Sequence, residues 1–320
     1  MKERILIIQL RRVGDVIFTL PVIGTLRKHL PDARIDFLVE PPGDQMVRLH
    51  PGLNETLVYD KDRPLEWLMK IRRNRYDWVL DFHSNGRTLL LTLASGAPLR
   101  AGLDGPFTRR IVYTHRVRTT DSKYLPEQKL DVLRALGIPC EGWDWGLKIP
   151  EAEAVWAENL LDKSGVKAGD ILVGLAPATR RPIRAWMEDR WAFVAEKLAA
   201  GSKKILLLWG PGEKDLAERV RGSIKNAPEG RVILPEETTL LQLAALIKNC
   251  SAVLAVDNGP KNMAVALGVP TLTLSGPTNP MSFDPHGDPR HLVVRPEGGD
   301  RMENIDAPRV YEGALKILAA

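Results

Sequence analysis

The sequence predicts an α/β protein built as two similar halves, each a mostly parallel sheet with helices on both faces. Short apolar runs rich in β-branched residues alternate with stretches of helical periodicity, which is the pattern of βαβ units. An irregular stretch ahead of residues 150–165 separates two such series, so we expect the domain boundary there. A chain of 320 residues also favours two domains over one.

The composition is that of an ordinary soluble globular protein, with 44% hydrophobic and 27% charged residues. Cys140 and Cys250 lie far apart and lack metal-ligand spacing, so they indicate neither a disulfide framework nor a zinc site. The first apolar run begins almost at Met1, and no stretch approaches the length of a membrane span. These features predict a cytoplasmic protein. The net charge of +5 is by itself typical of a solvated surface.

The first half is expected to contain four strands and four helical stretches. A proline at position 21 should kink or divide the first helical stretch. The strands are expected at 5–10, 34–39, 57–59 and 78–82, and the helices at 16–30, 65–75, 88–94 and 125–136.

The second half repeats this scheme after a linking helix at 152–161. The apolar run at 252–256 stops at a turn cluster, and a helix with a narrow small-residue face follows it. The strands are expected at 171–175, 204–209, 232–234, 252–256, 269–274 and 292–294, with helices at 191–200, 215–225, 240–248 and from 307 onward.

Polar turns follow four of the predicted strands, at residues 11–15, 176–184, 210–213 and 257–261. Ligands of parallel α/β sheets bind at the carboxyl ends of strands, so these turns predict a binding site. The turn at 257–261 also precedes a helix, whose N-terminal N–H groups and dipole favour an anion. We therefore interpret it as half of a nucleotide-diphosphate site.

Each turn residue has a structural and a functional interpretation. Asp15 is either an N-cap carboxylate or a general base. Arginines and a threonine at 179–184 either form an exposed basic loop or bind a diphosphate, and Trp186 beyond them is expected to pack. Glu213 and Asp257 are either helix-terminal acids or acceptors for ribose hydroxyls.

Several other functions lack their sequence signals. The chain has no G-x-G-x-x-G after the first strand, no P-loop, no G-x-S-x-G elbow and no H-x-x-x-H pair. A basic segment at 100–123, which includes Arg109 and Arg110, suits an anionic acceptor or a membrane surface. Aromatic residues are not interleaved with these basic residues, so nucleic acid is not indicated.

With these residues assembled, the chain resembles glycosyltransferase family 9, the ADP-heptose:lipopolysaccharide heptosyltransferases. The resemblance covers nearly the whole chain, and its motifs come in the family's order and spacing. They are Val13-Gly14-Asp15, Tyr76 to Asp81, Arg100-Ala101-Gly102, Arg184-Ala185-Trp186, Trp209 to Glu213, Asp257 to Pro270 and Gly276-Pro277-Thr278.

The resemblance implies a GT-B fold, in which two Rossmann-like domains face an interdomain cleft. Residues 1–155 would bind the acceptor, residues 156–303 would bind the nucleotide sugar, and a helix at 304–320 would pack back on the N-terminal domain. It implies inverting transfer of a heptose from ADP-heptose to an anionic glycolipid of the lipopolysaccharide inner core. No metal or other cofactor would take part, and the enzyme would work at the cytoplasmic face of the inner membrane.

The same resemblance implies roles for individual residues. Asp15 would be the general base. Thr179 and Arg184 would hold the diphosphate, with Arg184 counted as catalytic together with Asp15. Glu213 would bind the ribose, and Asp257 to Gly259 would line the nucleotide end. Arg180 and Asn262 would also belong to the nucleotide-sugar site. The acceptor would meet Arg11, Arg12, His83, Arg109 and Arg110.

The chain departs from the family pattern at Asn258 and Asn262, where Ser or Thr and His are usual. Asparagine can hydrogen-bond a phosphate or hydroxyl but carries no charge and shuttles no proton. The departure bears on leaving-group binding and donor identity. Two alternatives therefore remain open: transfer from another nucleotide sugar, and a non-catalytic sugar-nucleotide-binding protein.

Overall fold

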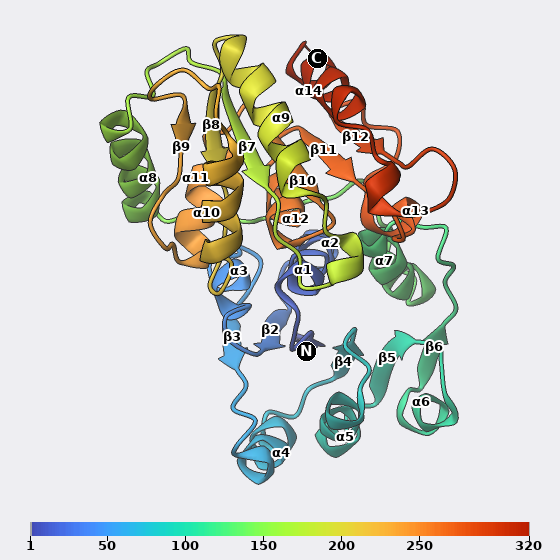
Figure 1. The fold of residues 1–320 in the computed structure, drawn as a ribbon. Helices are drawn as coiled ribbons and strands as arrows, with labels where there is room; N and C mark the ends of the chain where they lie inside the picture. Colours follow the sequence, from blue (N-terminus) through green and yellow to red (C-terminus); the bar gives the residue numbers. More distant parts are fainter. Residues whose placement is uncertain (1, 320) are drawn as a thin grey trace. The chain divides into compact units, whose positions relative to one another are not determined.

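The computed structural model of the protein describes residues 2–319. The chain forms two compact units, Met1–Lys148 and Ile149–Ala320 (Figure 1). The sequence places the boundary at 155/156, which lies inside the helix α8 (Glu151–Lys163). In the structure this helix belongs wholly to the second unit, because it packs along α11 (Leu240–Lys248) there.

The first unit is built on a six-stranded sheet in the order β3-β2-β1-β4-β5-β6, and every neighbouring pair is parallel. The central strand β1 is buried from Ile5 to Ile8, as an apolar run covered on both faces must be. The strands are β1 (Arg4–Ile8), β2 (Arg34–Val39), β3 (Glu55–Val58), β4 (Trp78–Asp81), β5 (Leu99–Leu103) and β6 (His115–Val117).

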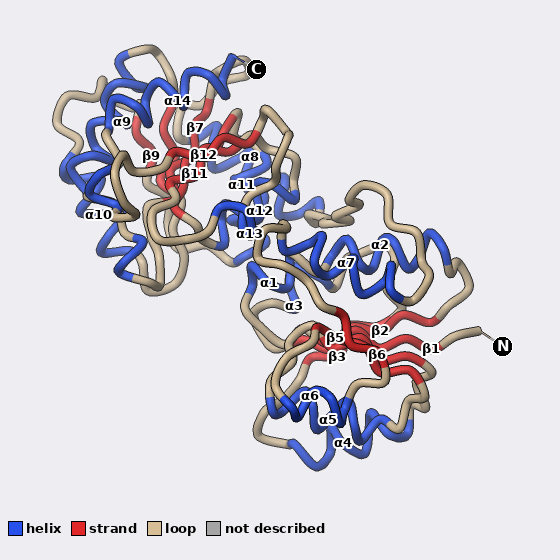
Figure 2. Tube along the Cα trace, turned by 90° about the vertical axis from the view of Figure 1, so that its right-hand side faces the viewer, coloured by secondary structure: helices blue, strands red, loops and turns tan. Residues whose placement is uncertain are grey.

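Helices cover both faces of this sheet. Figure 2 shows α4, α5 and α6 together on one face and α2 and α7 on the other. Pro21 occupies the first turn of α2, and the predicted 16–30 helix is divided into α1 and α2 just before it. The helices are α1 (Val13–Ile17), α2 (Leu20–His29), α3 (Asp44–Val47), α4 (Pro64–Arg73), α5 (Gly86–Ser95), α6 (Phe107–Val112) and α7 (Leu125–Ala135).

The second unit repeats the sheet, in the order β12-β11-β10-β7-β8-β9, again with all pairs parallel. Its strands are β7 (Leu172–Ala176), β8 (Lys204–Leu207), β9 (Val232–Ile233), β10 (Ala252–Val256), β11 (Thr271–Leu274) and β12 (His291–Val294). Its other helices are η1 (Pro182–Arg184), α9 (Glu188–Ala200), α10 (Lys214–Ser223), α12 (Gly259–Ala266), α13 (Pro280–Phe283), η2 (Met302–Asn304) and α14 (Ala307–Ala319).

The last helix packs within the unit that contains it. The sequence places residues 304–320 against the N-terminal domain. In the structure α14 packs on α9 and on β10, β11 and β12 of the second unit, and its Val310, Ala314 and Ile317 belong to that unit's core. Its apolar face is therefore covered within the unit that contains it.

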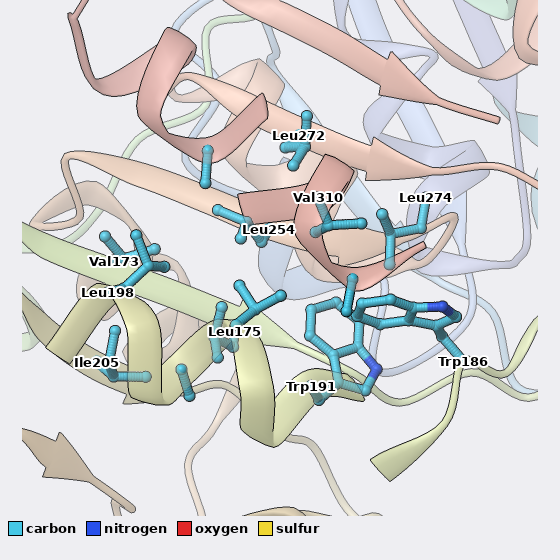
Figure 3. Close-up of a cluster of buried hydrophobic side chains, with 14 of the residues drawn as sticks. Val173, Leu175, Trp186, Trp191, Leu198, Ile205, Leu254, Leu272, Leu274 and Val310 are labelled. Carbon is cyan, nitrogen blue, oxygen red and sulfur yellow. The ribbon is translucent and has the colours of Figure 1, made fainter. Parts of the chain in front are cut away.

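A cluster of buried apolar side chains joins the sheet of the second unit to α9 and α14 (Figure 3). Trp186 and Trp191 meet edge to face in it, with their ring centroids 5.1 Å apart. The Trp186 Nε1–H also donates to the Ile305 carbonyl at 3.0 Å. Trp186 is thus a packing residue, as predicted, and it anchors the end of the loop that carries Arg184.

Candidate active site

The strand order places three of the four predicted polar turns, at 11–15, 176–184 and 257–261, at the topological switch points of the two sheets, and the turn at 210–213 follows β8. Each sheet reverses its order between the first and fourth strands of its unit, β1 and β4 in one and β7 and β10 in the other. Connections leave these two strands in opposite directions, which opens a crevice at their carboxyl ends. Asp15 and His83 follow β1 and β4, and Arg184 and Asp257 follow β7 and β10.

Asp15 is the third residue of α1 and is half-buried. Its Oδ2 accepts the main-chain N–H of Arg12 at 3.1 Å, so the carboxylate does close the first turn of the helix. Its Oδ1 accepts no hydrogen bond from the residues that the structure describes. Asp15 is therefore not the N-cap residue, which is Arg12, but one of its oxygens accepts the N–H of that residue while the other stays available.

A buried hydrogen-bonded chain lies under this turn. The Lys129 ammonium of α7 donates to Gln9 Oε1 at 2.8 Å, and Gln9 Nε2 meets His83 Nδ1 at 3.1 Å and the Arg11 carbonyl at 2.7 Å. Burial lowers the pKa of Lys129 to about 8, against the opposing charges of Asp15 and Asp81. Burial likewise lowers the pKa of His83. These hydrogen bonds place the Lys129 ammonium and the neutral His83 imidazole beside the carboxyl end of β1, which Asp15 follows.

Asp81 fixes the turn that presents His83. Its Oδ1 accepts the N–H groups of His83 and Ser84 at 3.0 and 2.9 Å, and its Oδ2 accepts the Tyr113 hydroxyl at 2.9 Å. The carboxyl is fully buried, and that burial raises its pKa. Arg109 reinforces the same turn, because its guanidinium donates to the Ser84 carbonyl at 3.2 Å.

The predicted acceptor-binding arginines differ in how many hydrogen bonds and ion pairs they form within the protein. Arg109 also donates to the carbonyls of Leu103 and Asp104, so its guanidinium is largely engaged inside the unit. Arg11, Arg12 and Arg110 are exposed and form no ion pair with the described part of the chain. Their role in acceptor binding stays a prediction.

In the second unit, Asp257 lies between two cations. Its Oδ2 is 2.6 Å from Arg184 Nη1, and its Oδ1 is 3.5 Å from Lys261 Nζ. Lys261 is completely buried and also lies 3.3 Å from Asp284 Oδ1, which accepts the Thr273 hydroxyl at 2.8 Å. The cluster pairs two cations with two carboxylates, which is how buried charges are tolerated.

The cluster orients Arg184 and leaves most of its donors available. Only its Nη1 donates to Asp257 among the described residues, and a guanidinium carries five N–H donors. The Arg184 guanidinium also lies 5.6 Å from the centre of the Phe283 ring. Burial raises the pKa of Asp257, while Lys261 and Arg184 act in the opposite direction.

Asn258 ties the two switch-point loops of this unit together. Its Oδ1 caps α12 by accepting the Lys261 N–H at 3.0 Å, and its Nδ2 donates to the carbonyls of Ala176 and Ala178, each at 3.0 Å. A serine or threonine hydroxyl could make the cap but could not also donate to both carbonyls. Asparagine at position 258, where the resemblance implies Ser or Thr, therefore joins two loops as well as capping α12.

Asn262 lies in the first turns of α12 and is 5% exposed. Its Oδ1 is buried and has no hydrogen-bond partner among residues 2–319. An unpaired buried amide oxygen lowers the free energy of unfolding by about 1–3 kcal/mol, and a hydrogen bond from a ligand would remove that penalty. The Asn262 amide oxygen thus accepts no hydrogen bond from the described residues, whereas both polar atoms of the Asn258 amide are engaged.

The remaining predicted residues of this unit follow β7, β8 and β10. Thr179 is half-buried, and its Oγ1 accepts the Arg181 N–H at 3.2 Å. Arg180 is exposed. Glu213 is the residue before α10, and its Oε2 accepts the Gly210 N–H at 2.9 Å, so it closes its own turn. Gly259 begins α12.

Four residues of these clusters are not among those predicted from the sequence: Gln9, Lys129, Lys261 and Asp284. Lys261 could have been found, since it follows Asp257 by four residues in the turn and first part of a helix, a spacing that brings side chains together. Lys129 and Gln9 are 120 residues apart, and nothing local connects them. Asp284 follows a short helix in a proline-rich loop and carries no local signal either.

Two further observations concern the chemistry and setting of the site. Within residues 2–319, no three His, Cys, Asp or Glu side chains are grouped as they would be around a metal ion. No helix in the same range has both the length and the apolar character needed to span a bilayer.

Comparisons with known proteins give the family. A sequence model of glycosyltransferase family 9 (heptosyltransferase) matches residues 66–303. Lipopolysaccharide heptosyltransferase 3 of Escherichia coli K12 is 29% identical over 294 residues, which cover 86% of this chain and 83% of that protein.

Solved structures show the same fold. A glycosyl transferase family 9 protein from Veillonella parvula DSM 2008 superposes with a TM-score of 0.88 at 23% identity, covering 100% of this chain and 98% of the other. The E. coli heptosyltransferase WaaC with ADP gives a TM-score of 0.75 at 23% identity, covering 99% and 100%.

The protein has the GT-B fold that the resemblance implies. Both six-stranded parallel sheets have the Rossmann strand order, and the whole chain superposes on the two solved structures. The family model spans well over half of the chain and includes Arg184 and Asp257. The chain belongs to glycosyltransferase family 9, the heptosyltransferase family, and is a glycosyltransferase.

Proposed function

We propose that the protein transfers a heptose from ADP-heptose to a sugar of the lipopolysaccharide inner core, with inversion at the anomeric carbon and without a metal ion or other cofactor. A related lipopolysaccharide heptosyltransferase and an ADP-bound heptosyltransferase support the substrates. The observation that carries the proposal is the half-buried carboxylate of Asp15, with one free oxygen, at the switch point of one sheet. The other sheet has an oriented guanidinium, Arg184, at its own switch point.

The second unit would hold the donor. The departing diphosphate needs its charge neutralised, and without a metal that task falls to Arg184, Arg180 and the N-terminus of α12. Asp257 keeps Arg184 in place while the other N–H groups of the guanidinium reach the phosphate oxygens. Glu213 and the residues 257–259 would meet the nucleoside.

The first unit would supply the base. Asp15 accepts the proton of the acceptor hydroxyl as its oxygen bonds to the anomeric carbon, and the bond from that carbon to the diphosphate breaks with its electron pair leaving on ADP. One carboxylate on the face opposite the leaving group suffices for inversion. Exposed Arg11, Arg12 and Arg110 would bind the anionic acceptor, presented at the cytoplasmic face of the inner membrane.

The test is ADP release from ADP-heptose in the presence of a core acceptor. Asp15→Asn removes the base and keeps a side chain that can accept the Arg12 N–H, so we expect the rate to fall by about 10²–10⁴-fold with little change in stability. Glu3→Gln, a carboxylate outside both switch points, is the control. Full turnover by Asp15→Asn would show that the base is another group.

Asn262 supports a second candidate within the same reaction class, transfer from a different nucleotide sugar. Its buried amide oxygen has no hydrogen-bond partner among the described residues and can accept one from a donor sugar. The histidine that the resemblance implies at this position would instead be a titratable ring. A panel of ADP-, UDP- and GDP-sugars separates the candidates. If both the wild type and Asn262→His prefer ADP-heptose, the second candidate is excluded. If the protein binds ADP-heptose but turns it over on no acceptor, it is a non-catalytic sugar-nucleotide-binding protein.

A further inference from the structure

Large apolar side chains are exposed on neighbouring helices of the first unit. Leu90 and Leu93 of α5 are 53% and 49% exposed, and Phe107 and Ile111 of α6 are 71% and 61% exposed. Each pair follows helical spacing and so forms a stripe on its helix. Exposed apolar side chains that cluster in this way mark an interaction surface rather than ordinary scatter.

Leu90 and Leu93 line a groove between the two helices, the α5–α6 groove, with a volume of about 360 Å³, and Phe107 and Ile111 are sequence neighbours of the α6 residues that line it. Its walls are mostly apolar, and Arg109 and Ser84 lie along it. The groove is lined by Leu89, Leu90 and Leu93 on one side and by Pro106 and Val112 on the other. Figure 2 shows α4, α5 and α6 on the same face of the sheet, and α4 adds exposed Leu65 and Met69.

The groove begins at the site described above. Ser84 and Gly86, at one end, belong to the turn after β4 that Asp81 fixes and that presents His83. A molecule with a sugar at that edge could therefore extend an apolar part along α5 and α6. The surface and the acceptor site are continuous.

The same segment carries the chain's excess charge. Residues 86–118 contain six arginines, one aspartate and no lysine or glutamate, and their net charge of +5 equals the excess of the whole chain. The aspartate, Asp104, is paired with Arg116 and Arg118, and Arg87 is paired with Glu40 outside the segment. Arg110 lies between Phe107 and Ile111, is exposed, and forms no ion pair with residues 2–319.

We propose that the α5–α6 face, meaning the groove with Leu90, Leu93, Phe107, Ile111 and Arg110, docks on an anionic lipid bilayer. Apolar side chains beside an unpaired cation suit the boundary between acyl chains and anionic headgroups. A second copy of the chain is a poor occupant, since a symmetric contact would set one +5 segment against another. This proposal rests on the proposed function in one respect: the glycolipid acceptor of that function lies in a bilayer.

Vesicle sedimentation with the full chain tests the proposal without donor or acceptor. The wild type should bind vesicles of phosphatidylcholine and phosphatidylglycerol, bind phosphatidylcholine alone weakly, and lose binding as salt rises. Phe107→Ser/Ile111→Ser should weaken binding by about tenfold or more. Arg110→Glu should weaken binding to the anionic vesicles selectively.

Matched controls come from the second unit. Val155→Ser/Leu315→Ser removes two exposed apolar side chains, and Arg221→Glu reverses an exposed charge there. Neither should change vesicle binding. The Phe107 and Ile111 side chains are exposed, so the urea midpoint of their double variant should match that of the wild type.

Three outcomes would overturn the proposal: no binding by the wild type, equal binding by the double variant, or a dimer in solution that the double variant dissociates. Activity distinguishes this failure from that of the proposed function. The double variant should transfer sugar normally to a delipidated acceptor and slowly to one embedded in vesicles. If the wild type transfers no heptose, the proposed function fails while the sedimentation result stands.

Discussion

Lys261 is the residue on which the donor-side cluster depends. It is completely buried, and its ammonium lies within 3.5 Å of carboxylate oxygens of both Asp257 and Asp284. Burying these charges is tolerable only because they compensate one another. Asp257 in turn pairs with Arg184, so the buried lysine helps to fix the carboxylate that orients the Arg184 guanidinium.

Replacing Lys261 with methionine should be strongly destabilising. The variant keeps the volume but leaves Asp284 without its cation, and we expect the free energy of unfolding to fall by about 3–5 kcal/mol in urea denaturation. Adding Asp284→Asn should recover part of the loss, because the uncompensated carboxylate is then gone.

Lys163→Met at an exposed position is the control and should change stability by less than about 0.5 kcal/mol. A loss of less than about 1 kcal/mol for Lys261→Met would show that the two carboxylates are protonated or otherwise compensated.

At the scale of elements, the site is made where loops from two adjacent strands are joined. Asn258 caps α12 and at the same time holds the carbonyls of Ala176 and Ala178, which follow β7. Trp186 anchors the far end of the same loop in the core. The segment that carries Thr179 and Arg184 is therefore fixed at both ends.

A series at Asn258 separates its two functions. Asn258→Ser keeps a cap but leaves the two carbonyls without their donor, whereas Asn258→Ala loses both. We expect losses of about 1–2 kcal/mol for serine and about 2–4 kcal/mol for alanine in the free energy of unfolding.

Thr239→Ala, at the N-cap of α11, removes a cap alone and should cost about 1 kcal/mol. Equal losses for serine and alanine at position 258 would mean that the cap contributes nothing. An alanine loss equal to that of Thr239→Ala would mean that the tie to the β7 loop contributes nothing.

For the whole molecule, two buried histidines predict a loss of stability in acid. Burial lowers the pKa of both His50 and His291 from 6.5 to about 4. Between those values the unfolded chain binds a proton that the native state does not, so stability falls as the pH falls from 6.5 towards 4.

His50→Gln should reduce this dependence, because glutamine does not titrate. From pH 7 to pH 5 the wild type should lose roughly 1–2 kcal/mol more than the variant in urea denaturation. His115→Gln, at an exposed position, should leave the pH dependence as in the wild type. Parallel pH profiles for wild type and His50→Gln would contradict the prediction.

Much of the architecture could be predicted because its signals are local. Apolar runs and helical periodicity indicated ten of the twelve strands, and turn residues put Asp15, Arg184 and Asp257 at strand ends. The exceptions are β5 and β6 at the sheet edge. In β5, Arg100 and Gly102 hide the apolar pattern, and Gly102 is required because a Cβ there would lie 2.7 Å from the Tyr113 ring.

The sequence by itself therefore determined the α/β class, the two halves, the family and the positions of the polar turns. Only the tertiary structure decided the place of α14, the pairing of Arg184 with Asp257 across 73 residues, and the burial of Lys129 against Gln9 across 120. The reason is physical. Periodicity and turn chemistry act between neighbours in the chain, whereas compensation of buried charge depends on which distant side chains the packed sheet brings together.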